Sequence, residues 1–344
     1  MENLKFTEKE WKAADSPIQI LFDDIVQVQL PLPYALNHVN VYLLQGKNGW
    51  TIVDTGLNIS SARAIWEDVF ARFQIKPGTL EQIVITHLHP DHFGMAGWLQ
   101  SRFSTADRTV PVYVSAQEHN NFSKFWGNLE RFAPPMAELL VACGLPALFA
   151  QAVMEGTLKT GHQTRPLPHL SMIPQDDAGH VILGDRSFEM IYAPGHADGQ
   201  VIFYDKGEKL FLSGDQILMK ITPNIGFWHD TKQGVLQRYL DSLKELERYE
   251  VSIGLPGHKW LIAGWQERIA EMFAHHDDRL EHTYGALSPQ GETVNAVSQA
   301  VFRLKELNIH QSRFAVTETL AHLDLLESRG KIQREVRDGV WYYT

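Results

Sequence analysis

The sequence has few of the features that would place it outside the class of globular proteins. Its single cysteine, Cys143, cannot form a disulfide within the chain, and a zinc site built from several thiolates is excluded. No run of about 18 apolar residues is present that could span a membrane. Because the first twenty residues are charged and lack an apolar signal segment, we expect a cytoplasmic protein with no membrane partner.

Positive charge is also scarce. Lysine and arginine together number 31 against 41 aspartates and glutamates, and the formal net charge is −10 at pH 7. Such a field repels phosphate backbones unless basic residues are clustered, and the sequence contains no basic run. The expected partner is therefore a small-molecule substrate rather than a nucleic acid. The sequence does not set the oligomeric state, and a homo-oligomer is compatible with it.

Short β-rich runs alternate with helical patterns, which is typical of an α/β protein. Residues 25–53 contain three such runs separated by turn residues and predict an opening antiparallel meander. A helical spacing follows at 60–73, and a short buried strand at 82–85 leads into a histidine-rich segment. Strand patterns resume at 188–212 and begin a second half that ends near Gly257.

Residues 118–161 interrupt this alternation with a long apolar and helical stretch. Its aromatic residues include Phe122, Trp126 and Phe149. We predict an inserted helical lid that covers an apolar part of the substrate, because ligand sites are mostly lined by apolar groups. Ordinary packing explains the same aromatics equally well.

The C-terminal segment, residues 288–344, has a pattern of its own. Helical spacings at 292–307 and 316–329 precede two strand-like runs around an Asp338-Gly339 turn, which predicts a winged-helix-like domain. We therefore divide the chain into a catalytic domain, 1–287, and this small domain, 288–344.

Apolar residues at helical spacing indicate that the two helices of the segment are docked rather than free. They are Val301, Leu304, Leu320, Leu323 and Leu326. The segment carries seven lysines and arginines and seven aspartates and glutamates, so no net positive charge attracts a phosphate backbone. A structural role or a part in substrate binding is the expectation.

The motif THLHPDH contains four possible metal ligands within six residues. His87 and His89 are two apart on a predicted strand and share a face, so both can hold one ion. Pro90 breaks the strand and turns Asp91 and His92 toward a second ion. Three imidazoles packed so closely resist joint protonation, which favours a cation site over a chance surface loop.

Two metals need more ligands than the motif supplies. Three further polar residues follow predicted strands beside glycines that allow tight bends: His196 in APGHADG, Asp215 in SGDQ and His258 in LPGHKW. The spacing predicts two groups of ligands bridged by Asp215. The first group is His87, His89 and His196, and the second is Asp91, His92 and His258. Zinc is the expected metal, with manganese or iron as alternatives.

THLHPDH resembles the HxHxDH signature of the metallo-β-lactamase superfamily, and His196, Asp215 and His258 follow in that family's order. The likeness covers about residues 20–275 and is greater to the glyoxalase II-like and general hydrolase branches than to the cysteine-bearing β-lactamases. It implies an αββα sandwich with a dinuclear metal site at the edge between two sheets. It also implies that Asp54, in VDTG, orients a metal-bound imidazole.

The expected activity is hydrolysis of an ester or thioester by hydroxide held between the metals, with Asp91 and Asp215 as the catalytic carboxylates. His38, His229 and Lys259 lie where they could contact substrate.

Three alternatives stay open. A metal-dependent endoribonuclease would share the metal site and the C-terminal segment. A redox diiron protein of the same fold would carry a carboxylate in place of His89. A binding module without enzymatic activity would lack some ligands, and none is missing.

Overall fold

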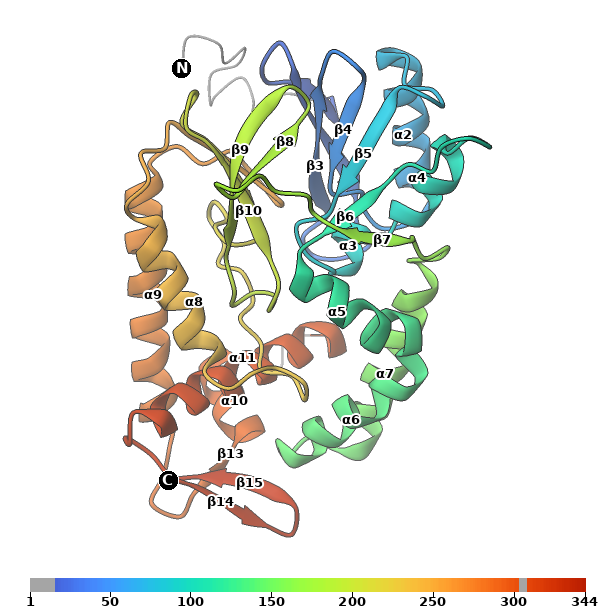
Figure 1. The fold of residues 1–344 in the computed structure, drawn as a ribbon. Coiled ribbons are helices and arrows are strands. Elements are labelled where there is room, and N and C mark those ends of the chain that lie inside the picture. Colours follow the sequence, from blue (N-terminus) through green and yellow to red (C-terminus); the bar gives the residue numbers. More distant parts are fainter. Residues whose placement is uncertain (1–15, 303–307) are drawn as a thin grey trace.

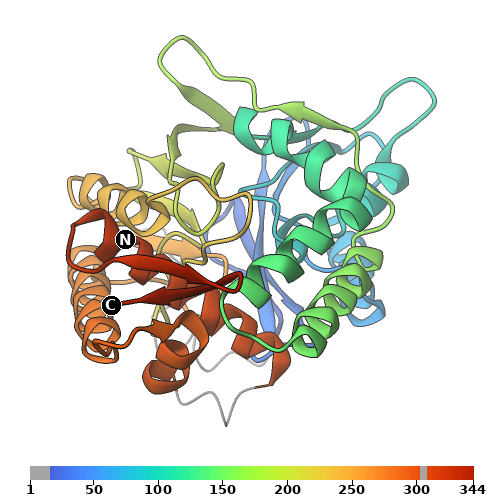
Figure 2. The same ribbon diagram turned by 90° about the horizontal axis from the view of Figure 1, so that it is seen from below.

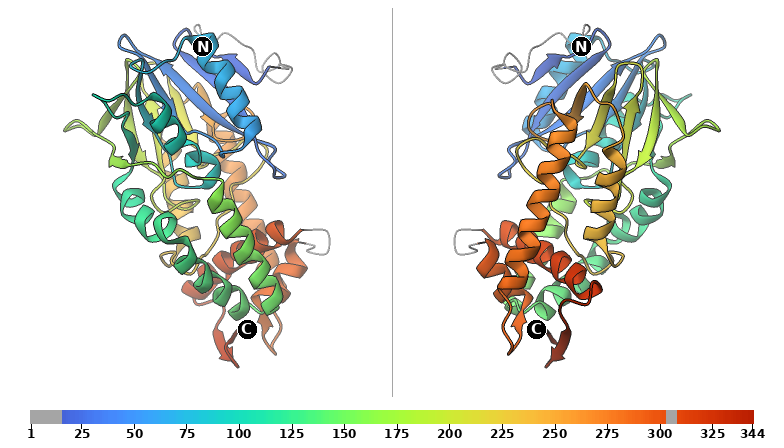
Figure 3. Two further views of the ribbon diagram at one scale, coloured as in Figure 1. Left: turned by 90° about the vertical axis from the view of Figure 1, so that its right-hand side faces the viewer. Right: turned by 90° about the vertical axis from the view of Figure 1, so that its left-hand side faces the viewer.

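The computed structural model describes residues 16–302 and 308–344 and contains two β-sheets that face each other (Figure 1). Helices cover their outer faces: α2 (Ser60–Phe73) lies on the side of the first sheet, and α8 (Val235–Leu246) and α9 (Trp265–Gly285) lie on the side of the second (Figure 3). This confirms the αββα sandwich. Within the described ranges, no helix combines the length and apolar character that crossing a membrane requires.

The first sheet contains seven strands in chain order. Its strands are β1 (Ile18–Ile20), β2 (Ile25–Pro31), β3 (His38–Gln45), β4 (Trp50–Val53), β5 (Leu80–Val84), β6 (Val112–Val114) and β7 (Leu170–Met172). The first four pair antiparallel, as the meander predicts, and the last four pair parallel. Alternate residues of β3 face opposite cores: Val41 and Leu43 pack toward the helices, whereas Tyr42 and Leu44 pack between the sheets.

The second sheet has five strands in the order β12-β11-β10-β9-β8. Its strands are β8 (His180–Leu183), β9 (Arg186–Tyr192), β10 (Val201–Asp205), β11 (Leu210–Gly214) and β12 (Ile253–Pro256). In β10, Val201 and Phe203 pack between the sheets, while Ile202 packs toward the helices. Because β11 and β12 are parallel, their carboxyl ends lie at the same edge of the sheet.

The helical insertion is present and begins two residues earlier than predicted. It comprises α5 (Ala116–Phe125), the 3₁₀ turn η1 (Trp126–Asn128), α6 (Leu129–Ala142) and α7 (Ala147–His162), and it follows α4 (Ala96–Phe103) and β6. The buried Trp126 donates from its indole N–H to the Leu88 carbonyl at 3.0 Å. This bond anchors the insertion to the histidine-rich segment, and a role as a lid stays a prediction.

The C-terminal segment forms two helices and a small sheet, which lie beside α6 when the molecule is seen from below (Figure 2). The helices are α10 (Val294–Phe302) and α11 (Ile309–Ser328), and the sheet contains β13 (Glu292–Thr293), β14 (Arg334–Arg337) and β15 (Val340–Tyr343). Leu320, Leu323 and Leu326 are buried in one core with α8 and α9, so the segment is docked, as their spacing predicts.

The predicted start of the second C-terminal helix, at residue 316, is wrong. α11 begins at Ile309, where Asn308 and Gln311 form a capping box. Leu304 and the rest of 303–307, the predicted end of the first helix, lie outside the described residues. The winged-helix assignment stays a prediction.

Candidate metal centre

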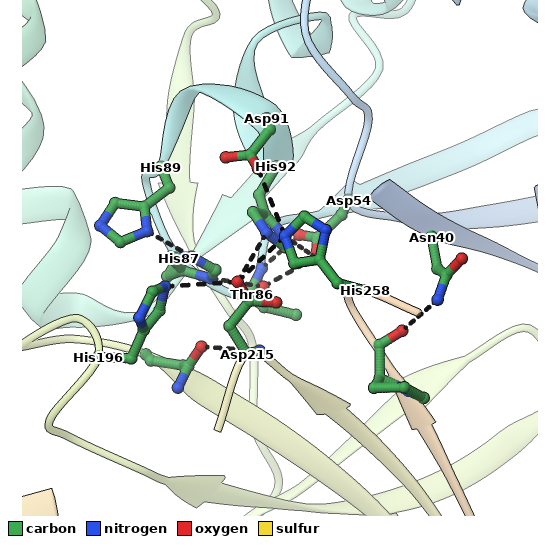
Figure 4. Close-up of polar contacts among 12 residues, drawn as sticks. Asn40, Asp54, Thr86, His87, His89, Asp91, His92, His196, Asp215 and His258 are labelled. Carbon is green, nitrogen blue, oxygen red and sulfur yellow. Dashed lines mark hydrogen bonds and ion pairs between the residues drawn. The ribbon is translucent and has the colours of Figure 1, made fainter. Parts of the chain in front are cut away.

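Seven side chains from four segments meet at the edge between the two sheets (Figure 4). His87 and His89 come directly after β5, and the short helix α3 (Pro90–Phe93) then carries Asp91 and His92. The break predicted at Pro90 is present, because His89 is extended and Pro90 is the first helical residue. His196 follows β9, Asp215 follows β11, and His258 follows β12.

The structure gathers these residues into the groups expected from the sequence. Donor atoms of His87, His89 and His196 lie within 4.8 Å of one another, and those of Asp91, His92 and His258 do the same. Asp215 lies between the two groups. Its Oδ2 is 3.5 Å from His92 Nε2, 3.4 Å from His196 Nε2 and 3.2 Å from His258 Nε2. This is the position that a bridging carboxylate requires.

The far nitrogen of each of three imidazoles has an oxygen partner. His92 Nδ1 donates to Asp54 at 2.8 Å, His196 Nδ1 to the Asn224 carbonyl at 2.9 Å, and His258 Nδ1 to the His38 carbonyl at 2.8 Å. A neutral imidazole that donates from Nδ1 keeps a lone pair on Nε2. These lone pairs point toward the centre of the group.

Those inward nitrogens test whether divalent ions fit. The Nε2 atoms of His92, His196 and His258 are buried without a hydrogen-bond partner, and so is Asp215 Oδ1. Leaving so many buried polar atoms unsatisfied is costly, and cations at the centre would satisfy all of them. Oriented neutral imidazoles together with carboxylates are ligands that zinc accepts. The residues present therefore fit two divalent metals.

The charges at the site agree with this. Burial lowers the pKa of His87, and burial together with His196 lowers that of His89 to about 3, so both imidazoles are neutral at pH 7. Burial also lowers the pKa of His258, but the charges of Asp215 and Asp91 outweigh it and raise the pKa. The carboxylates thus favour positive charge at the centre, which metal ions would supply in place of protons.

Asp54 contacts the His92 ring on the side away from Asp215. The backbone of Asp54 is in the left-handed conformation, with φ of 61°. Its carboxylate accepts hydrogen bonds from the Thr86 amide and hydroxyl, each at 2.8 Å, besides the one from His92. Three donors hold the carboxylate in place, so Asp54 determines how the His92 ring is turned.

Glycine is required at position 257 because the backbone passes close to the centre. A Cβ at Gly257 would lie 2.2 Å from Asp215 Oδ1 and 2.8 Å from His92 Cε1. The Gly257 amide donates to the Gly214 carbonyl at 2.7 Å, and its carbonyl accepts from the Asn40 amide at 2.7 Å. The backbone is held on both sides and leaves no room for a side chain.

None of the three residues predicted to contact substrate belongs to the donor groups of the metal centre. The His38 ring contacts Asn37 Oδ1 at 2.9 Å, and it is the His38 carbonyl that holds His258. The Lys259 ammonium donates to the Leu36 carbonyl at 3.2 Å and to Asn37 Oδ1 at 3.3 Å. The His229 ring packs 4.2 Å from the Phe132 ring. Contact of these residues with substrate stays a prediction.

Two residues that support His196 were missed at the level of sequence. Asn224, whose carbonyl holds His196, donates from its side-chain amide to Glu318 Oε2 on α11 at 2.8 Å. Burial raises the pKa of Glu318 to about 7. The sequence does not distinguish Glu318 from the other acidic residues of segment 288–344, because no local pattern shows that it is buried.

Comparisons with known proteins agree with this geometry. A model of the metallo-beta-lactamase superfamily matches residues 35–258, and a model of a metallo-beta-lactamase-like C-terminal domain matches residues 280–344. The probable metallo-hydrolase YqjP of Bacillus subtilis (strain 168) is 26% identical over 321 residues, which cover 90% of this chain and 94% of that protein.

A solved structure and a second relative extend the comparison. The crystal structure of a metallo-beta-lactamase family protein from Thermus thermophilus is 30% identical with a TM-score of 0.81, covering 93% of this chain and 98% of that one. An acyl-coenzyme A thioesterase of Homo sapiens is 23% identical over 218 residues, which cover 60% of this chain and 67% of the human protein.

Proposed function

Because this chain belongs to the metallo-β-lactamase superfamily and is a metallo-hydrolase, we propose that it uses two zinc ions to hydrolyse an ester or thioester bond of a small molecule. One observation carries the proposal. The Nε2 atoms of His92, His196 and His258 are buried without hydrogen-bond partners and lie 3.2–3.5 Å from Asp215 Oδ2, while the opposite nitrogen of each ring is held by an oxygen.

When bound, two divalent cations lower the pKa of a coordinated water toward neutrality and polarise the bond to be cleaved. The residues of the chain position the reactants. Asp215, with 6% of its side chain exposed, is buried between the two ligand groups and would bind both metal ions. Asp91, with 16% exposed, lies on the open side, where its carboxylate would help to hold a metal ion and would accept a hydrogen bond from the attacking water. No serine or cysteine nucleophile is required.

The ester or thioester class is supported by the human thioesterase relative and by the charge of the chain. The net charge of −10 and the charge balance of the C-terminal segment oppose binding of a long phosphodiester. His89 stands where a diiron centre would carry a carboxylate, which favours hydrolysis over redox chemistry.

A substrate panel tests the proposal. Purified full-length protein, loaded with zinc or manganese, is assayed with esters, thioesters, lactones, phosphodiesters and RNA. We expect ester or thioester hydrolysis that stops on chelation and returns with metal.

Fluorescence anisotropy of labelled RNA and DNA at about 100 mM salt accompanies the panel, since phosphate-neutralising binding should still be visible there. RNA cleavage together with micromolar, salt-sensitive binding would instead establish the ribonuclease. The absence of hydrolysis from metal-loaded protein would contradict the proposal.

A further inference from the structure

Arg313, near the start of α11, is a cation with no acidic partner among residues 16–302 and 308–344. Its Nη1 is 3.4 Å from Thr157 Oγ1 on α7, its Nη2 is 3.4 Å from His310 Nδ1, and its Nε has no partner. A guanidinium offers five N–H donors, and two long contacts to neutral groups leave most of them unused. The described surroundings therefore do not balance its charge.

Aromatic rings surround the same guanidinium. Its Cζ lies 4.5 Å from the Phe314 ring centroid and 5.3 Å from that of Trp228. Burial lowers the pKa of Arg313 to about 10, so the side chain is still a cation at neutral pH. Arg313 is partly buried and its Nε is fully buried, so the guanidinium loses part of its hydration without gaining a counter-ion, and an anion that enters from outside would offset that loss.

Arg313 and its neighbours His310, Phe314 and Trp228 are connected to the metal centre through two loops. The Tyr34 ring stacks on the His310 ring with centroids 5.2 Å apart, and the Tyr34 loop continues to His38, whose carbonyl holds His258. Trp228 belongs to the loop in which Asn224 holds His196. The first turns of α11 lie beside α7, and the helix runs past that loop (Figure 1).

Both the residues around Arg313 and the metal centre are accessible to solvent. Tyr34 and Arg313 are partly exposed, and His310 is exposed. On the metal side, His89 and Asp91 are partly exposed.

We propose that Arg313, assisted by His310 and Tyr34, binds an anionic group, a carboxylate or a phosphate, that the substrate carries away from the bond to be cleaved. The inference rests on the proposed function and names its substrate class: an ester or thioester with an anionic end. Arginine suits this role because its planar fork makes two parallel hydrogen bonds to a carboxylate or phosphate. Trp228 and Phe314 would contact the part of the substrate next to the anion.

Kinetics of three variants test the proposal in full-length, zinc-loaded protein whose metal content is measured. Arg313→Met removes the charge with little change in length, Arg313→Lys keeps the charge, and Arg329→Met removes an exposed charge from the end of the same helix as a control. The substrates are thioesters of equal length that end in a methyl, a carboxylate or a phosphate group. Comparison of the carboxylate and phosphate substrates shows which of the two anions Arg313 prefers.

We expect Arg313→Met to lower kcat/KM about tenfold or more for an anionic substrate, mainly through KM, and less than about twofold for the methyl substrate. Arg313→Lys should recover part of the loss, and Arg329→Met should change none of the three. An equal fall for neutral and anionic substrates, or no fall at all, would overturn the proposal.

Calorimetric titration of the same variants with glutarate and with inorganic phosphate separates this inference from the proposed function. We expect wild-type protein and Arg329→Met to bind one of these anions at a site that Arg313→Met lacks. If no ester or thioester is hydrolysed but this binding is present, the proposed function fails and the anion site stands. If hydrolysis is present without any effect of Arg313 on binding or selectivity, the anion site is wrong.

Discussion

Replacing Gly257 with alanine should disable the metal centre while leaving the fold largely intact. The added methyl would lie 2.2 Å from Asp215 Oδ1, whereas ordinary contacts begin at 3.4 Å. The backbone cannot retreat easily, because Gly257 is hydrogen-bonded to Gly214 on one side and to Asn40 on the other, each at 2.7 Å. The Asp215 carboxylate, whose Oδ1 has no partner, is the group that must move.

The distance by which the Asp215 carboxylate must move determines how far the rate should fall. The carboxylate must shift by about 1 Å, and a shift of this size in a catalytic group costs about 100-fold in rate. That corresponds to about 2.7 kcal/mol in the activation barrier. Overpacking at one site costs about 1–3 kcal/mol of folding stability, which a domain of this size can tolerate. We therefore expect a folded protein with reduced metal content and about 100-fold lower kcat/KM.

Gly156→Ala is the matched control. Gly156 lies inside α7, and a Cβ there would meet nothing within 4 Å. Because glycine in a helix costs about 0.5–1 kcal/mol relative to alanine, this variant should be slightly more stable and equally active. Metal content by mass spectrometry, thermal unfolding and kcat/KM on the best ester substrate are measured for both variants. A Gly257→Ala protein with two metals per chain and wild-type kcat/KM would refute the reasoning.

Three further predictions concern the same centre and its support. Asp215→Asn should remove nearly all hydrolysis and lower metal content because the bridge loses its charge, whereas Asp107→Asn, at an exposed position, should change neither; equal losses in both folded variants would overturn the ligand assignment. Elemental analysis should find about two metals per chain, and chelation should lower the melting temperature reversibly because binding stabilises the folded state; at most one metal after zinc is supplied would exclude a dinuclear site. Burial raises the pKa of Glu318 from 4.5 to about 7, so the folded protein keeps this proton where the unfolded chain has lost it. The stability of wild type relative to Glu318→Gln should therefore fall as pH rises from 4.5 to about 7, by at most about 1.4 kcal/mol per pH unit, and urea denaturation that gives a constant difference would contradict this.

Local spacing predicts much of this protein. His87, His89, Asp91 and His92 lie in one short segment, so their relation depends on strand alternation and one proline rather than on distant packing. Strands β2 to β5 of the first sheet, β9 to β11 of the second and the inserted helices also follow from apolar periods that the structure confirms, whereas β1, β7 and β8 were not predicted. The start of α11 was predicted too late, although its signal, Asn308 followed by Gln311, is present in the sequence.

The partners of the metal-site residues were decided by tertiary structure alone. Asn224 and the carbonyl of His38 hold imidazoles through contacts between segments far apart in the chain, and a carbonyl has no sequence signature. Arg313 and Glu318 lie in the same helix, yet packing of α11 against the catalytic domain leaves Arg313 without a counter-ion among the described residues and raises the pKa of Glu318. Periodicity specifies which residues share a face, but the groups that meet that face depend on how whole elements pack, so these roles appear only in the folded chain.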